Sequence, residues 1–256
     1  MRGRARSIVV EAASGKKSGV SFGRAAGIVL VLIALAILLS LGTWQVQRLH
    51  WKEGLLAAMT ERRAAPPVDL AAIEAMAQAG EDIDYRTVRV TGTYLNDKER
   101  HFFATYEGRT GYYVYTPLQL ADGRFLLVNR GFVPFERKEA ATRRQGQLSG
   151  AQTVTGLARV KLTQKPSWAV PDNDVAKNIF YWKDLDVMAS SAGLDAAQVV
   201  PFFVDADTTP IPGGMPIGGV TQFDLPNNHL QYAVTWYGLA AALVAVCGVF
   251  ILRRKR

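Results

Sequence analysis

The chain has 256 residues, 49% of them hydrophobic, and a formal net charge of +8. Residues 1–24 and 253–256 hold ten of the 30 basic residues but one of the 22 acidic residues, so the rest of the chain is close to neutral. This distribution excludes a basic nucleic-acid-binding domain, and we expect no nucleic-acid partner.

Two long windows, residues 25–44 and 232–252, contain no charged residue. Helices over these 20 and 21 residues would reach about 30 Å, the thickness of the hydrocarbon core of a bilayer. We therefore predict two transmembrane helices. Aromatic side chains flank both windows on one side of the predicted membrane, as is typical of a membrane interface: Trp44, Trp51, Tyr232, Trp236 and Tyr237.

The basic tails, residues 1–24 and 253–256, predict that both chain ends are cytoplasmic. Residues 45–231 then form an extracytoplasmic domain. A bacterial inner (plasma) membrane is favoured, in contact with membrane lipid, and a mitochondrial inner membrane is the alternative. A cleaved signal peptide is the alternative for the first window, but its apolar stretch is longer than the usual ~7–15 residues.

The domain between the windows begins with segments that predict helices and continues with segments that predict strands. The first helix is expected to extend over residues 44–63, with an interruption at Gly54, and Asp69 is expected to cap a second helix ending at Gly80. Period-two alternation predicts about seven strands, with a turn at residues 121–123. The strand-like segments are 85–95, 101–108, 111–120, 123–135, 152–162, the start of 178–194, and 199–207.

These elements predict a membrane protein in which two transmembrane helices flank a mainly antiparallel β domain of α+β type. Short turns between most strands favour antiparallel pairing. We expect a curled sheet or a partly open barrel.

Enzyme motifs are missing from the sequence. The glycine-rich segment 212–219 lacks the Lys-Ser/Thr pair of a phosphate-binding loop, and no G-x-S-x-G, H-E-x-x-H or C-x-x-C motif occurs. Cys247 is the single cysteine and lies in the second window, which excludes an intramolecular disulfide and a thiol-based metal site in the outer domain. We predict that the protein is not an enzyme.

Three histidines are present. His101 is expected to be structural and partly exposed, and His50 to be interfacial. His229 precedes the second window, and at helical spacing it shares a stripe with Tyr232, Ala233, Trp236 and Ala240. Neutral imidazole is a common haem ligand and an aromatic face suits a planar macrocycle, so His229 is a candidate axial ligand. A helix-capping or interfacial role for His229 is the alternative.

Small residues also recur on the second window at Gly238, Ala241, Ala245 and Gly248. Such a stripe allows close helix packing in lipid. The partner could be the first window or a helix of another membrane protein.

Several segments resemble the surfeit locus protein one family, also called Surf-one or Shy-one. They are GTWQVQRLHWK, YRTVRVTGTY, LLVNRGFVP, TRRQGQLSG, YWKDL, PFFVDAD, PGGMPIGG and NNHLQYAVTWYGLA, in this order from Gly42 onward. Residues 64–82 carry no segment of this resemblance.

The resemblance implies an assembly factor for haem–copper cytochrome c oxidase, acting on catalytic subunit one while its haem a and copper centres form. It implies transient haem a binding, with His229 as the iron ligand. If this protein holds haem a at the outer edge of the bilayer, we expect Tyr232 and Trp236 to be packing or gating groups. The expected partners are oxidase subunit one and the haem a synthase. A cofactor-free chaperone of oxidase subunits, and an extracytoplasmic sensor or binding module, are the alternatives. The short tails without a signalling domain argue against the sensor.

Overall fold

The computed structural model describes residues 22–221, 223 and 226–253. The chain divides into two compact units, a helical unit of Met1–Lys52 with Asn227–Arg256 and a β unit of Glu53–Pro226. The long helix α1 contributes to both, because it runs without a break from Phe22 to Ala64.

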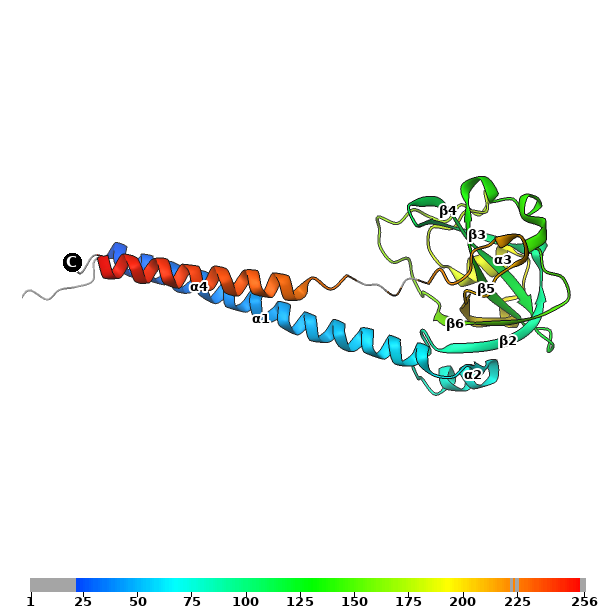
Figure 1. The fold of residues 1–256 in the computed structure, drawn as a ribbon, viewed down its shortest axis with the longest axis horizontal. Coiled ribbons are helices and arrows are strands. Elements are labelled where there is room, and N and C mark those ends of the chain that lie inside the picture. The colour runs from blue at the N-terminus through cyan, green and yellow to red at the C-terminus, as the bar shows by residue number, and fades with distance from the viewer. Residues whose placement is uncertain (1–21, 222, 224–225, 254–256) are drawn as a thin grey trace, which may run out of the picture. The chain divides into compact units, whose positions relative to one another are not determined.

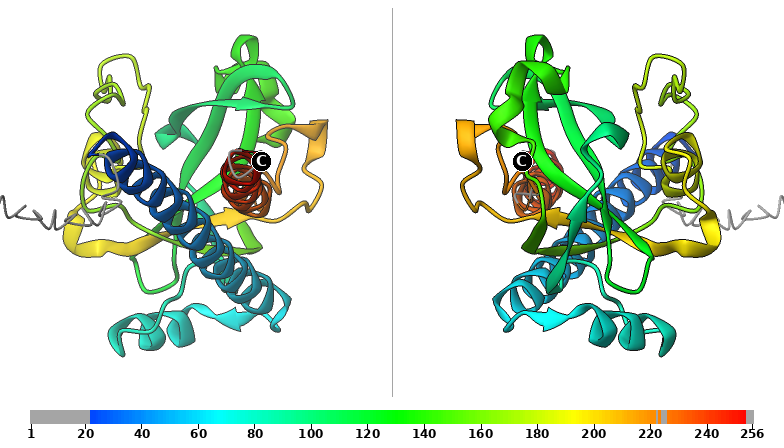
Figure 2. Two further views of the ribbon diagram at one scale, coloured as in Figure 1. Left: turned by 90° about the vertical axis from the view of Figure 1, so that its left-hand side faces the viewer. Right: turned by 90° about the vertical axis from the view of Figure 1, so that its right-hand side faces the viewer.

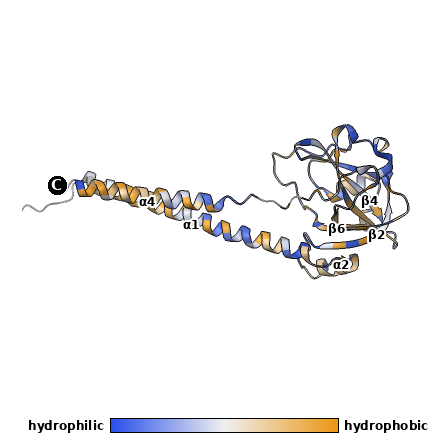
Figure 3. Ribbon diagram, viewed as in Figure 1, coloured by the Kyte–Doolittle hydropathy of each residue, from blue (hydrophilic) through white to orange (hydrophobic). Residues whose placement is uncertain are grey.

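The helical unit contains the first part of α1 and the helix α4, His229–Arg253, which lie side by side (Figure 1). Both are long and apolar enough to cross a membrane, and only 6% of the apolar window in each is buried inside the protein. Figure 3 shows hydrophobic residues along α4 and along the N-terminal part of α1, with hydrophilic residues in the C-terminal part of α1. A core helix of a soluble protein would be mostly buried, so these helices suit lipid surroundings.

The helix bounds differ in detail from the windows predicted from sequence. Gly54 lies inside α1 with no interruption, and its missing side chain leaves open space around it. The predicted spans 25–44 and 232–252 both fall within these helices. Their exact limits in a bilayer, and the assignment of residues 1–24 and 253–256 to the cytoplasm, remain predictions. Most of both tails lies outside the described residues.

The β unit is a seven-stranded sheet in the order β1-β2-β6-β7-β5-β4-β3, and an added pairing of β2 with β4 closes five of the strands into a barrel (Figure 2). The strands are β1 (Val68–Asp69), β2 (Thr87–Tyr94), β3 (Arg100–Tyr106), β4 (Arg109–Gln119), β5 (Phe125–Pro134), β6 (Ala151–Val160) and β7 (Val199–Ala206). The remaining helices are α2 (Leu70–Gln78), α3 (Leu185–Ser191) and the 3₁₀ helices η1 (Asn96–Lys98), η2 (Phe135–Arg137), η3 (Ala140–Gly146), η4 (Ala196–Gln198) and η5 (Pro212–Gly214).

β4 makes the closure possible because it is long. Along its first part it pairs with β3, and at Leu118 and Gln119 the same edge pairs with Tyr94 and Thr93 of β2. β7 lies between β6 and β5, antiparallel to the first and parallel to the second. The predicted curled sheet or barrel is confirmed, and the parallel β5–β7 pair is an addition to it.

Apolar side chains are buried on both faces of β5 and β7. Val128 and Val204 pair and face the barrel interior, whereas Leu127 and Phe203 pair and face outward. Ile73 of α2 belongs to the interior cluster, and Met188 of α3 belongs to the outer one. Burial of both faces explains why the sequence of β5 is almost continuously apolar.

Two sequence predictions have different outcomes. Asp69 caps α2 as expected, because its side chain accepts a hydrogen bond from the backbone N–H of Ala72. The strand expected at the start of residues 178–194 is wrong, since Phe180 forms only an isolated bridge to Phe102 of β3. Phe180 is fully buried in the outer cluster. The apolar residues next to it in sequence therefore resemble those of a buried strand.

Candidate functional site

His229 is the first residue of α4, and a side chain of α1 holds it. Its Nδ1 atom lies 2.7 Å from Oε1 of Gln45. Gln45 is only 8% exposed although it is polar and lies next to the apolar part of α1. Two residues earlier on α1, the hydroxyl of Thr43 lies 3.1 Å from the hydroxyl of Tyr237, so polar contacts join the helices at two levels.

The Gln45 contact determines which ring nitrogen of His229 carries the proton. An amide oxygen can only accept, so Nδ1 donates and Nε2 of the neutral ring keeps its lone pair. Among the described residues Nε2 has no hydrogen-bond partner. Metal-ligating histidines typically have one nitrogen held in this way, which fixes the tautomer and the ring orientation.

The aromatic residues predicted beside His229 lie in different surroundings. Tyr232 is 54% exposed, Trp236 is half-buried, and Ala233 and Ala240 are buried at 2% and 4% exposure. The residues of the predicted stripe therefore differ in burial. The two alanines are buried, whereas the two aromatic side chains are at least partly accessible. Tyr232 and Trp236 follow His229 by three and seven residues along α4, and part of each side chain is accessible.

The small-residue stripe of α4 does not pack on α1. A Cβ placed on Gly238 or on Gly248 would have no atom of the described chain within 4 Å, and Ala241 and Ala245 are exposed. The close approach occurs elsewhere, at Gly42 of α1, where a Cβ would lie 2.9 Å from the ring of Tyr237. Of the two alternatives left open by the sequence, packing of this stripe against the first window is not observed.

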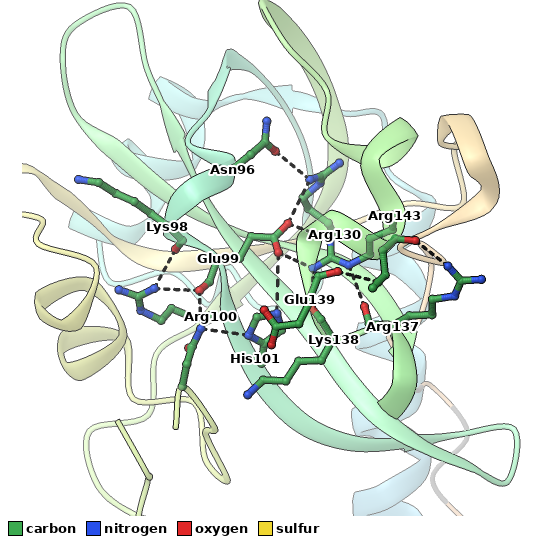
Figure 4. A network of polar contacts seen from close by, with 12 residues as sticks. Asn96, Lys98, Glu99, Arg100, His101, Arg130, Arg137, Lys138, Glu139 and Arg143 are labelled. Carbon is green, nitrogen blue, oxygen red and sulfur yellow. Dashed lines mark hydrogen bonds and ion pairs between the residues drawn. The ribbon is translucent and has the colours of Figure 1, made fainter. Parts of the chain in front are cut away.

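A buried ionic network in the β unit is the second polar feature, and sequence reasoning missed it (Figure 4). Glu99 accepts two hydrogen bonds from Arg143, one from Nη1 at 2.9 Å and one from Nη2. Nη1 of Arg130 lies 3.8 Å from the same carboxylate, and Nη2 of Arg130 donates to the carbonyl of Gly146. The exposures of Glu99, Arg130 and Arg143 are 5%, 1% and 6%.

His101 belongs to this network and is 6% exposed, so the expectation of partial exposure is wrong. The side-chain amide of Asn178 donates to Nδ1 of His101 at 3.0 Å. Nε2 of His101 lies 3.8 Å from Oε2 of Glu99. Burial lowers the pKa of His101 to about 4, against the opposing pull of Glu99. Burial also lowers the pKa of the Arg130 guanidinium, and that group lies 4.5 Å from the ring centroid of Tyr94. With one carboxylate for two arginines and a neutral histidine, the network carries an excess positive charge.

Three of the resembling segments meet at this network. Gly131 follows Arg130 with φ of 120°, and a Cβ there would lie 1.9 Å from the carbonyl oxygen of Ile217. A Cβ on Gly146 would lie 2.0 Å from the carbonyl oxygen of Met215. The segments LLVNRGFVP, TRRQGQLSG and PGGMPIGG thus hold one another in place. Their residue types are explained by packing.

The donor set around His229 suits haem better than a bare metal ion. The described part of the chain contains no group of three or more His, Cys, Asp or Glu that could hold a metal. A haem iron is held mainly by the macrocycle, so a single protein imidazole would suffice to bind it. An imidazole with a free Nε2, followed along α4 by Tyr232 and Trp236, would therefore fit this cofactor. His50, in contrast, is exposed on α1.

Comparisons with known proteins agree with the resemblance. The SURF1 family model matches residues 32–241. Surfeit locus protein 1 of Rattus norvegicus is 39% identical over 228 residues, covering 83% of this chain and 71% of the rat protein. The Homo sapiens protein of the same name is 39% identical over 232 residues, covering 84% and 73%. A SURF1-like protein of Monosiga brevicollis is 36% identical over 247 residues, covering 91% and 90%. This chain is a membrane protein of the SURF1 family.

Proposed function

We propose that this protein is an assembly factor for haem–copper cytochrome c oxidase, without catalysis of its own, that holds haem a for catalytic subunit one. Family membership supports the assembly role, and the observation that carries haem binding is the free Nε2 of His229, with Nδ1 bonded to Gln45. Subunit one and the haem a synthase are the proposed partners. The proposed location is the bacterial inner membrane, with both termini cytoplasmic.

The residues of this chain have separate tasks in the proposal. Gln45 fixes the ring of His229 so that Nε2 faces the ligand. Trp236 and Tyr232 supply apolar surface beside it, and the exposed Tyr232 ring leaves that surface reachable from the lipid side. When bound, haem a would supply an iron centre, and the imidazole of His229 would hold it. A single protein ligand would suit temporary holding of a cofactor that is then passed on.

The test is the visible spectrum of the full-length protein purified from cells that make haem a. We expect a Soret band for the natural protein and its loss in His229→Ala, with both proteins inserted in the membrane. His50→Ala is the matched control, since His50 is an exposed histidine of α1. Unchanged pigment in His229→Ala would exclude His229 as the ligand.

A second candidate is a cofactor-free chaperone of subunit one. The hydrogen bond between His229 and Gln45 favours it too, because the same bond would simply join two helices. In this case the natural protein would show no Soret band, yet would still co-purify with subunit one. His229→Ala would then weaken the helix pairing without a spectral change.

A further inference from the structure

An arginine-lined pocket of about 400 Å³ lies on the β unit, and neither His229 nor any other residue of α4 lines it. Helices η2 and η3 and the turn of η5 form its walls. Its lining includes the side chains of Arg137, Arg143 and Arg144, and the residues Gln145, Gly213 and Met215. Among the described residues that line it, none is acidic.

The charge beneath the pocket is also positive. Arg143 is buried and bonded to Glu99, but Arg130 shares that single carboxylate at 3.8 Å. Each of the three side-chain nitrogen atoms of Arg143 donates to a protein acceptor, including the carbonyl of Arg137 at 3.1 Å. Arg143 therefore contributes charge and rigidity to the wall, and it does not reach out to a ligand.

Arg137 and Arg144 are the groups with donors to spare. Both are exposed, and Nη1 of Arg137 donates to the carbonyl of Thr142 at 2.6 Å, which orients that guanidinium. The side chain of Arg144 has no hydrogen bond or ion pair with any residue that the structure describes. Two unneutralised guanidinium groups beside a buried positive charge repel each other unless an anion lies between them.

We propose that this pocket binds an oxyanion of the phosphate class, as a phospholipid headgroup or as free phosphate. The planar guanidinium donates two parallel hydrogen bonds to phosphate oxygens, which makes arginine pairs well suited to this group. The predicted membrane setting makes headgroups available, whereas a solvent-open pocket also admits free phosphate. The proposal is independent of haem binding at His229.

The experiment is calorimetric titration of the full-length protein in a maltoside detergent, which contains no phosphate. The probes are inorganic phosphate, dihexanoyl phosphatidylglycerol and dihexanoyl phosphatidylcholine, each at low and at high salt. We expect binding that weakens with salt, and a dissociation constant about ten-fold higher for Arg144→Gln. The double variant Arg137→Gln/Arg144→Gln should abolish binding, and Arg144→Lys should lie between the natural protein and Arg144→Gln.

Arg89→Gln is the matched control, because it removes the same charge from an exposed position on β2, outside the pocket. Binding of inorganic phosphate, lost in the double variant, supports a site for the free oxyanion. Binding of the lipid probes alone, lost in the same variant, supports a headgroup site. Absence of binding by all three probes, or equal weakening by Arg89→Gln, would overturn the proposal. All variants change exposed residues, and thermal unfolding verifies that they remain folded.

Discussion

Nδ1 of His229 lies 2.7 Å from Oε1 of Gln45, so an amide of α1 orients the first residue of α4. A buried glutamine next to an apolar segment is costly unless its polar atoms are paired. The contact joins the resembling segments GTWQVQRLHWK and NNHLQYAVTWYGLA, which lie at opposite ends of the chain.

Gln45→Leu should reduce haem retention by the purified protein about ten- to hundred-fold, as is typical when the outer partner of a ligating histidine is lost. The change removes the acceptor but keeps a side chain of similar size. Titration of haem into the apo protein, followed in the Soret region, measures the effect. Gln47→Leu is the control, since Gln47 is exposed on the same helix. Equal retention in the two variants would contradict a positioning role for Gln45.

Glu99→Gln should lower the free energy of unfolding by about 3–5 kcal/mol, because it leaves Arg143 and Arg130 buried without a counter-charge. Chemical unfolding of the full-length protein in detergent measures this loss. Asp186→Asn breaks the more exposed pair with Lys161 and should cost about 0–1 kcal/mol. Similar costs for both variants would mean that the network contributes no more than a surface pair.

The β unit should lose stability as the pH falls from about 6.5 to about 4. The pKa of His101 is about 4 in the folded protein and 6.5 in its ordinary state. Folding therefore favours the neutral ring, and this contribution is complete above pH 6.5 and lost as the pH falls through 4. The expected loss is about 2–4 kcal/mol.

Glu99, Arg143 and Lys138 face His101 and modulate its titration. His101→Gln removes the titrating group, so its unfolding free energy should change less between pH 6.5 and pH 4 than that of the natural protein. Chemical unfolding measured across this range compares the two. Parallel pH profiles would show that His101 does not carry the effect.

Gly131→Ala should prevent the β unit from folding or destabilise it by more than about 3 kcal/mol, because the backbone is at φ of 120° and the new Cβ would meet the carbonyl of Ile217. Gly54→Ala is the opposite case. The position is helical with open space, so alanine should stabilise α1 by about 0.5–1 kcal/mol. Thermal unfolding monitored by circular dichroism tests both, and equal behaviour would refute the steric argument.

Local patterns predicted most elements of this fold. The cap at Asp69, the turn at Asp122 and the alternation in β2 depend on neighbouring residues and are visible in the sequence. The β2–β4 closure joins Tyr94 to Leu118, and the parallel β5–β7 pair joins Val128 to Val204, so neither follows from local pattern. The sequence predicted sheet type and left the order of strands open.

The two polar sites differ in the same way. His229 was recognisable because an imidazole precedes a charge-free window. Gln45 gave a weaker signal, as a polar residue at the end of the first window inside a resembling segment. Glu99 and Arg143 gave none, because charged residues are usually exposed and nothing in their spacing indicates that they meet in the interior.

The position of β7 has a consequence for incomplete chains. β7 is the last strand in sequence among the described residues, yet it lies between β6 and β5. A nonsense change upstream of Val199 would remove the strand that joins β6 to β5 in the described sheet. The barrel would then be open, with the unpaired edges of β5 and β6 facing water. Such a product would keep its N-terminal membrane anchor and expose strand edges that can pair with other chains. Early termination would therefore lead to aggregation and degradation at the membrane and not to a partly active protein.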